Sequence, residues 1–173
     1  MSRIDDLIKQ YSPDGVRFLS MGDVFEMKAG RNILAAAISA VADGDHPFRC
    51  YGGNGPRGYV ADYSHDGAYL LIGRQGALSG NVKRTTGKIY ATEHAVVTSP
   101  RSLDVMDIAF AYHLLVAMNL NQYVSKGAQP GLAVSTIARV RIPVPPLEVQ
   151  REIGRILDAF TELEAELEAE LEA

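Results

Sequence analysis

The chain has 173 residues, of which 47% are hydrophobic and 22% charged, with a formal net charge of −4, values ordinary for a soluble globular protein. No apolar run approaches the roughly 20 residues needed to span a bilayer, and the single cysteine, Cys50, excludes an internal disulfide and a cysteine zinc cluster. The N-terminal segment MSRIDDLIKQ resembles neither a signal peptide nor a transit peptide, so we expect a cytoplasmic chain of one well-buried domain plus an appendage.

Up to residue 98 the sequence predicts short strands separated by glycine. Residues 3–10 are compatible with a short helix or a loosely held arm, and the SPDG segment at residues 12–15 has the composition of a turn. An alanine-rich run predicts a short helix at residues 33–42. The pattern indicates an α+β fold with an irregular, mostly antiparallel β core, and strands are predicted at residues 16–19, 47–51, 69–72, 81–84 and 95–98.

The last part of the chain ends in a long predicted helix. Prolines cannot lie inside a helix, but Pro146 suits a first helical position, where its missing N–H costs nothing. A helix is therefore predicted to start at Pro146 or Leu147, with Glu148 in its first turn favourable to the helix dipole. Ahead of it the sequence predicts a packed apolar helix at residues 104–120, a turn at 127–131 and a strand at 140–144.

The long helix carries one apolar stripe at steps of three and four residues, which indicates either packing on its own domain or a coiled-coil seam. At 1.5 Å per residue, some 25 residues reach roughly 38 Å, too far for a small domain to cover, so we expect part of the stripe to meet a partner. We divide the chain into a domain at residues 1–145 and a helix at residues 146–173. The predicted contact residues are Ile153, Ile156, Leu157, Phe160, Leu163 and Leu167.

The charge is distributed unevenly between these two parts. Residues 1–145 contain 15 Lys and Arg against 12 Asp and Glu, whereas residues 146–173 contain 2 against 9. Within residues 49–101 there are 7 basic and 3 acidic residues, interleaved with glycines and tyrosines. This modest basic surface is compatible with contact to a phosphate backbone.

The segment GNGPRG at residues 53–58 matches the dinucleotide-binding pattern G-x-G-x-x-G. That pattern requires a strand, a helix opening at the glycines and a βαβ unit. Here Pro56 interrupts the motif, Tyr59 and Val60 continue in strand-like residues, and no βαβ unit follows. The segment predicts instead either a tight connection whose glycines adopt positive φ, or a loop that approaches DNA closely.

Residues 146–158 follow the form PLxxQxxIxxxLD after a proline-rich strand, through Pro146, Leu147, Gln150, Ile153, Leu157 and Asp158. This block resembles the junction between target-recognition domain and spacer helix in the specificity subunits of type I restriction-modification systems. Three upstream segments resemble the same family in the same order, so that the resemblance covers most of residues 17–165. They are YGGNGPRGY at residues 51–59, LIGRQGALSGNV at 71–82 and ATEHAVV at 91–97.

The resemblance implies a non-catalytic subunit that binds double-stranded DNA in a bacterial defence system. Such a subunit would read one half of a bipartite target and recruit methyltransferase subunits, and through them a restriction and translocase subunit. These partners would hold the cofactors of DNA methylation and cleavage. These subunits usually carry two recognition domains and two spacer helices, whereas this chain has one domain and stops inside its helix, as a half-subunit, a natural truncation or an expressed fragment would. Because the apolar stripe is larger than one small domain can cover, we expect two chains to pair through it as a homodimer, with no cofactor or metal of their own.

The predicted DNA contacts lie in the glycine-rich segments. Arg, Gln and Asn have the planar donor and acceptor geometry suited to base edges, whereas Lys suits phosphates as a point charge. Each such residue is also compatible with an ordinary solvated surface. The candidates are Asn54, Arg57, Tyr59, Arg74, Gln75, Asn81, Lys83, Arg84, Lys126 and Gln129.

Two further hypotheses remain open. Asp14, Glu26 and Lys28 fit the loose PD-(D/E)xK signature of Mg²⁺-dependent nucleases, in which carboxylates hold the metal. Metal-dependent cleavage by the isolated chain would favour this enzyme. The chain could instead be an assembly protein whose globular part caps the helix, which an absence of duplex affinity at low salt would favour.

Overall fold

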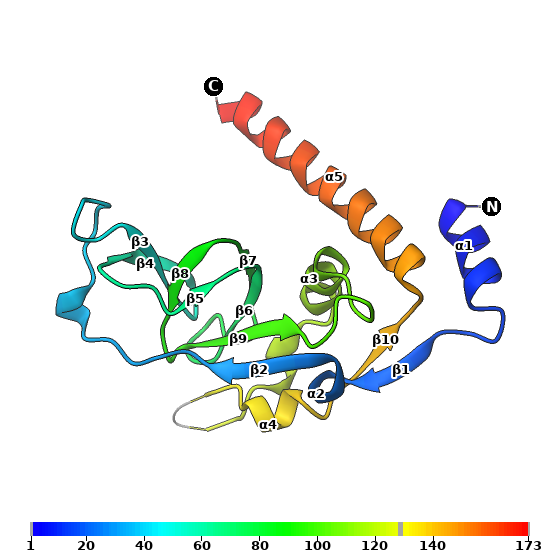
Figure 1. The fold of residues 1–173 in the computed structure, drawn as a ribbon, viewed down its shortest axis with the longest axis horizontal. Coiled ribbons are helices and arrows are strands. Elements are labelled where there is room, and N and C mark those ends of the chain that lie inside the picture. Colours follow the sequence, from blue (N-terminus) through cyan, green and yellow to red (C-terminus); the bar gives the residue numbers. More distant parts are fainter. Residues whose placement is uncertain (1, 128–129, 173) are drawn as a thin grey trace.

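A computed structural model describes residues 2–127 and 130–172 (Figure 1). The helices are α1 (Arg3–Tyr11), α2 (Met21–Val24), α3 (Ile108–Ala117), α4 (Val134–Ile137) and α5 (Leu147–Glu172), with 3₁₀ turns η1 (Ala35–Ala37) and η2 (Leu120–Tyr123). The strands are β1 (Arg17–Ser20), β2 (Phe25–Ala29), β3 (Phe48–Gly52), β4 (Gly55–Val60), β5 (His65–Asp66), β6 (Tyr69–Gly73), β7 (Val82–Thr85), β8 (Lys88–Ala91), β9 (Ala95–Pro100) and β10 (Arg141–Val144).

The central sheet has the strand order β2-β9-β6-β7, with every neighbouring pair antiparallel. Side chains alternate along β6, so Leu70 and Ile72 pack into the main core with α3, η2 and α4. Leu71, between them, faces a second, smaller core together with Ile89 and Val97. Strand β6 is therefore buried on both faces of the sheet.

The second sheet has the order β4-β3-β8-β5 and lies at the left of Figure 1. It supplies the other side of the smaller core through Ile89 and Ala91 of β8. Its strands are antiparallel except for the parallel pair β3 and β8. The predicted α+β fold with a mostly antiparallel core is thus confirmed.

A two-stranded ribbon of β1 and β10 connects the domain to α5, with Arg17 opposite Val144. Burial of Ile142 and Val144 fixes β10 on the main core. The chain then passes Pro145 and Pro146 and enters α5 at Leu147, as the proline pattern predicted.

The first two turns of α5 pack tightly on α3. A Cβ atom on Gly154 would lie 3.1 Å from the Ala109 Cβ and 3.1 Å from the Phe110 nitrogen, so glycine permits the close crossing of the two helices. Gln150 of α5 is fully buried and accepts a hydrogen bond from the Asp107 backbone N–H at 2.8 Å. Its amide nitrogen donates to the Val105 and Pro145 carbonyls at 2.8 and 2.7 Å. The glutamine of the PLxxQ block therefore fixes the helix to the domain.

Helix α1 lies beside the start of α5 (Figure 1), where Arg3 forms an ion pair with Glu152 at 3.3 Å. Ser2 caps α1 by accepting from the Asp5 N–H, while the Asp5 side chain accepts from the Ser2 N–H at 2.9 Å. The predicted arm is thus an ordered helix held against the base of α5.

One predicted helix is wrong. Residues 33–42 contain only the short turn η1, because the segment lies on the surface and has no buried stripe to stabilise a longer helix. Leu34 and Val41 are 77% and 64% exposed. The backbone of Ser39 instead pairs with Tyr59, at 2.8 Å in both directions, which holds it extended against β4.

The predicted strands hold to within a few residues, whereas the turn predicted at 127–131 includes residues 128–129, which lie outside the described residues. The five predicted strands correspond to β1, β3, β6, β7 and β9, and the strand at 140–144 corresponds to β10. Strands β2, β4, β5 and β8 were not predicted as such, and the helix predicted at 104–120 is shorter. It begins after Asp107, whose side chain accepts from the Phe110 N–H, and ends before Asn119, which adopts a left-handed φ of 48°.

In the described ranges, no helix has both the length and the apolar character that crossing a membrane requires.

Candidate nucleic-acid interface

Four loops converge at one end of the two sheets, and we call them the four-loop surface. They are the β3–β4 turn at residues 53–54, the β6–β7 connection at residues 74–81, the β8–β9 turn at residues 92–94, and the described parts of the η2–α4 connection, residues 124–127 and 130–133. The first three surround a hollow of about 300 Å³. Its lining residues are Gly52, Gly53, Asn54, Arg57, Gln75, Gly76, Ala77 and His94.

Backbone hydrogen bonds hold these loops together. The Arg74 N–H donates to the His94 carbonyl at 2.8 Å, and the Leu132 N–H donates to the Arg74 carbonyl at 2.8 Å. Gln75 and Gly131 also form an isolated antiparallel bridge. The β6–β7 connection is therefore fixed on both sides, which presents its side chains in a defined register.

Glycine is required where the β3–β4 turn crosses β6. A Cβ atom on Gly73 would lie 2.4 Å from the Gly53 carbonyl oxygen, and one on Gly53 would lie 2.7 Å from the His94 carbonyl oxygen. The glycine-rich segment at residues 53–58 is thus a tight connection between antiparallel strands, with Gly55 and Gly58 at positive φ. It opens no helix, so the dinucleotide-binding interpretation is excluded.

Three predicted contact residues line the same hollow: Asn54, Arg57 and Gln75. All three are exposed. Arg74 is half-buried beside them, and its guanidinium donates to the Glu93 carbonyl at 3.2 Å. It therefore serves partly to hold the β8–β9 turn.

Lys83 and Arg84 point to opposite faces of β7, because side chains alternate along a strand. Lys83 lies opposite Leu71, and its Cε is 3.8 Å from where a Cβ on Gly55 would lie, beside the β3–β4 turn. Arg84 lies opposite Leu70, on the side of α3 and α5. Only Lys83 is thus directed toward the four-loop surface.

Arg84 is bound to the C-terminal helix. Its guanidinium donates to both carboxylate oxygens of Asp158 at 3.1 and 3.0 Å and lies 5.0 Å from the centre of the Tyr112 ring. His113 Nε2 is 2.7 Å from the same carboxylate. Arg84 is the main cause that holds the pKa of Asp158 below its usual value, and His113 adds to it. These contacts favour a structural role for Arg84 over contact with DNA.

The remaining described candidates do not line this hollow. Tyr59 receives a hydrogen bond from Arg49 at 3.3 Å on the outer sheet. Asn81 and Lys126 are exposed at the ends of their loops. Gln129 lies outside the described residues.

His94 was not among the predicted DNA contacts, although it lies in the same hollow. Its Nδ1 is 2.7 Å from the Gln75 Oε1, and its Nε2 is 3.2 Å from a Glu93 carboxylate oxygen. The only signal in the sequence was its place in the ATEHAVV segment, since the partner Gln75 lies 19 residues away.

The nuclease residues do not form one site. Glu26 and Lys28 form an ion pair on β2, whereas Asp14 lies in the turn between α1 and β1. In the described ranges, no three His, Cys, Asp or Glu side chains are grouped closely enough to hold a metal ion. The geometry that the nuclease hypothesis requires is therefore absent from this part of the chain.

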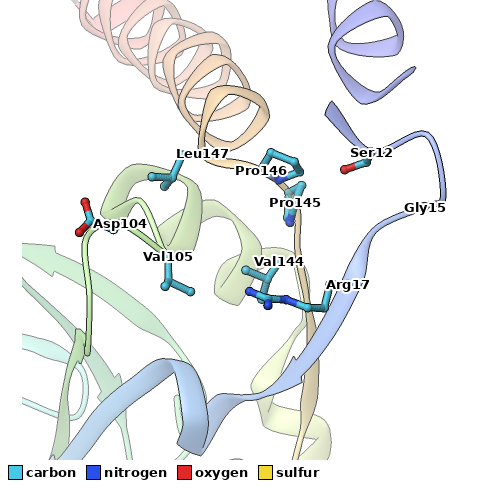
Figure 2. Close-up of a pocket in the computed structure, with 9 residues that line it drawn as sticks. All are labelled: Ser12, Gly15, Arg17, Asp104, Val105, Val144, Pro145, Pro146 and Leu147. Carbon is cyan, nitrogen blue, oxygen red and sulfur yellow. The ribbon is translucent and has the colours of Figure 1, made fainter. Parts of the chain in front are cut away.

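A second hollow of about 250 Å³ lies where α5 leaves the domain (Figure 2). Figure 2 shows Arg17 of β1, Asp104 before α3 and Leu147 of α5 around it. Its remaining lining residues are Ser12, Gly15, Val105, Val144, Pro145 and Pro146. This hollow belongs to the junction with α5 and includes none of the predicted DNA contacts.

Beyond its first turns, α5 extends away from the domain (Figure 1). Its apolar stripe is exposed there. Ile153 is still packed against the main core and Ile156 is half-buried. The exposed fractions are 37% for Leu157, 61% for Phe160, 54% for Leu163 and 58% for Leu167.

Comparison with known proteins gives one consistent family. The sequence profile described as type I restriction modification DNA specificity domain matches residues 13–173. The type I restriction enzyme EcoprrI specificity subunit of Escherichia coli is 51% identical over 144 residues, which are 83% of this chain and 35% of that protein. The chain thus spans about a third of the length of this curated relative.

Two solved structures share the fold. The S subunit of a type I restriction-modification system from M. genitalium superposes with a TM-score of 0.76 at 14% identity, covering 90% of this chain and 41% of that one. The HsdS subunit from Thermoanaerobacter tengcongensis gives a TM-score of 0.67 at 19% identity, with 96% and 44% covered.

Proposed function

The chain belongs to the family of type I restriction modification DNA specificity domains, and we propose that its four-loop surface reads one half of a bipartite target in double-stranded DNA. One observation carries this proposal. Asn54, Arg57 and Gln75 come from two separate glycine-rich segments and line one hollow. Arg pairs with guanine and Asn or Gln with adenine in the major groove, so this grouping is chemically suited to reading base edges.

The charge distribution also supports placing the four-loop surface against DNA. The weakly basic part of the chain contains the four-loop surface, and Lys83 stands beside the β3–β4 turn, where it can contact a phosphate. The last turns of α5 contain glutamate at every second position from 162 to 172. This acidic segment repels phosphate, so we place DNA against the loops and away from the helix.

We assign the chain a recognition role without catalysis. Its partners would be methyltransferase subunits and, through them, a restriction and translocase subunit. These partners would bind the methyl donor and ATP. The division into a recognition domain at residues 1–145 and a spacer helix at residues 146–173 belongs to the same proposal.

The exposed stripe of α5 supports pairing of two copies of the chain. Phe160, Leu163 and Leu167 are each more than half exposed on one face, and apolar side chains repeated at this spacing form coiled coils. We propose an antiparallel pair, because parallel alignment would bring the glutamates of both tails together. Two-fold symmetry would then place one recognition domain at each end, as a bipartite target requires.

Fluorescence anisotropy with a cognate duplex tests the DNA surface. Arg57→Ala should cost about 1–3 kcal/mol of binding and relax the preference at one base pair. Lys83→Ala should weaken all duplexes alike and reduce the salt slope by about one unit. Lys28→Ala is the matched control, because Lys28 is already paired with Glu26 on β2. Binding by both variants at the parent level would refute the assigned surface.

A further inference from the structure

Gln75 occupies the centre of the four-loop surface. It lines the hollow that contains Asn54 and Arg57, and also two adjacent hollows that are bordered by Gly131. Its backbone is fixed by the bridge to Gly131 and by the hydrogen bond of the neighbouring Arg74 N–H to the His94 carbonyl. Because this backbone is fixed, the bases that Gln75 can recognise depend on which of its amide groups, the oxygen acceptor or the N–H donors, is available.

His94 determines which of those groups is available. Its Nδ1 lies 2.7 Å from the Gln75 Oε1, and because a carbonyl oxygen can only accept, the imidazole donates this bond. Its Nε2 lies 3.2 Å from a carboxylate oxygen of Glu93, which also only accepts. The Nδ1 contact is therefore the hydrogen bond that holds Gln75, and Nε2 on the other side of the ring lies at ion-pair distance from Glu93.

Glu93 lies on the other side of the His94 ring. It is adjacent in sequence, and its second carboxylate oxygen, Oε2, is buried without a hydrogen-bond partner among the described residues. Glu93, His94 and Gln75 thus form a connected row from the β8–β9 turn to the β6–β7 connection.

In this arrangement His94 occupies one of the two lone pairs of the Gln75 oxygen, whereas the amide nitrogen keeps both N–H donors. Adenine offers one acceptor and one donor in the major groove, so a glutamine that reads it must accept with the same oxygen that His94 already contacts. Guanine offers two acceptors, N7 and O6, and needs donors alone. The row therefore matches guanine and disfavours adenine.

We infer that Gln75 is a specificity-determining residue for guanine and that His94 is the positioning residue that makes it so. The inference rests on the proposed function, because it assumes that the four-loop surface faces the major groove of DNA. It goes beyond that function by assigning which base Gln75 recognises and by giving His94 and Glu93 a part in that recognition.

The experiment measures base preference with duplexes derived from the sequence that the parent chain selects, each carrying one of the four bases at one position. Gln75→Ala identifies the position that depends on Gln75, since preference should be lost there alone. The parent should prefer guanine over adenine at that position by roughly tenfold or more, as expected for a well-formed base contact.

Two variants of His94 then separate positioning from mere structural support. His94→Ala frees the Gln75 oxygen, so the preference should move from guanine toward adenine by roughly tenfold. His94→Asn places an amide N–H near the former Nδ1, so it should retain the guanine preference. A residue that only supports the loop would weaken binding without changing the preferred base.

Adenine preference in the parent, or an unchanged preference in His94→Ala, would overturn the inference. If Gln75→Ala changes no position while Arg57→Ala does, the role of Gln75 is refuted and the proposed function stands. If the chain selects no sequence at all, the proposed function itself has failed.

Discussion

Replacing Gln150 tests whether the first turns of α5 are an integral part of the recognition domain. Its side chain makes hydrogen bonds to the Asp107 N–H and to the Val105 and Pro145 carbonyls, at 2.8, 2.8 and 2.7 Å. Each such bond contributes about 0.5–1.5 kcal/mol net, so Gln150→Ala should lower the free energy of unfolding by roughly 2–4 kcal/mol. Against a total of about 5–15 kcal/mol for a typical domain, this is a large loss.

Gln150→Glu is the sharper variant, because it keeps the shape and the acceptor for Asp107 but removes the two N–H donors. A carboxylate would then face two carbonyl oxygens in a fully buried position. Burial disfavours the charged form, so the pKa of this carboxyl in the folded state should exceed the unfolded value of about 4.3. The folded state then binds more protons, and the destabilisation should grow as pH rises above about 4.

Urea denaturation at fixed protein concentration measures both variants, since pairing of chains would make stability depend on concentration. Gln122→Ala is the control, because Gln122 is exposed and makes one bond, to the Met118 carbonyl. It should change the free energy of unfolding by less than about 0.5 kcal/mol. If Gln150→Ala changes stability as little as the control, the helix is not fixed to the domain as described.

Two further predictions concern α5. Asp158→Asn should lower stability by about 1 kcal/mol at pH 7, because the contacts with Arg84 and His113 are partly exposed. Because folding lowers the pKa of Asp158, the stability advantage of the parent over Asp158→Asn is present above about pH 4 and disappears as pH falls through the folded-state pKa. Equal urea midpoints of parent and variant at pH 7 would refute this role. Phe160→Asp with Leu163→Asp should give a folded monomer in sedimentation, whereas Glu162→Lys on the opposite face should not. A parent chain that is monomeric at tens of micromolar, roughly where a weak coiled coil associates, would contradict the homodimer.

The sequence predicted what depends on local chemistry. Pro143, Pro145 and Pro146 cannot lie inside a helix, and the helix begins at Leu147 as expected. The helix predicted for the alanine-rich run at residues 33–42 was wrong because this segment is determined by contacts with a distant part of the chain. Its helix propensity is high, but the pairing of Ser39 with Tyr59, which no local pattern encodes, keeps the backbone extended.

The site was predictable only in part, because its geometry depends on pairs far apart in sequence. Lys83 and Arg84 are neighbours of like charge, yet the strand directs one toward the loops and the other toward Asp158, 74 residues away. The contact of Gln75 with His94 likewise joins two loops through the sheet. Residue types could suggest these candidates, but only the fold separates those that face the hollow from those that hold the helix.

The most direct test of DNA reading by the four-loop surface is selection from a randomised duplex library by the purified chain at low salt, followed by sequencing of the bound fraction. The parent and the Lys28→Ala control should enrich the same short sequence. Arg57→Ala and Gln75→Ala should each lose preference at a different position of it. Absence of any enriched sequence, or an identical sequence from all four proteins, would contradict the account.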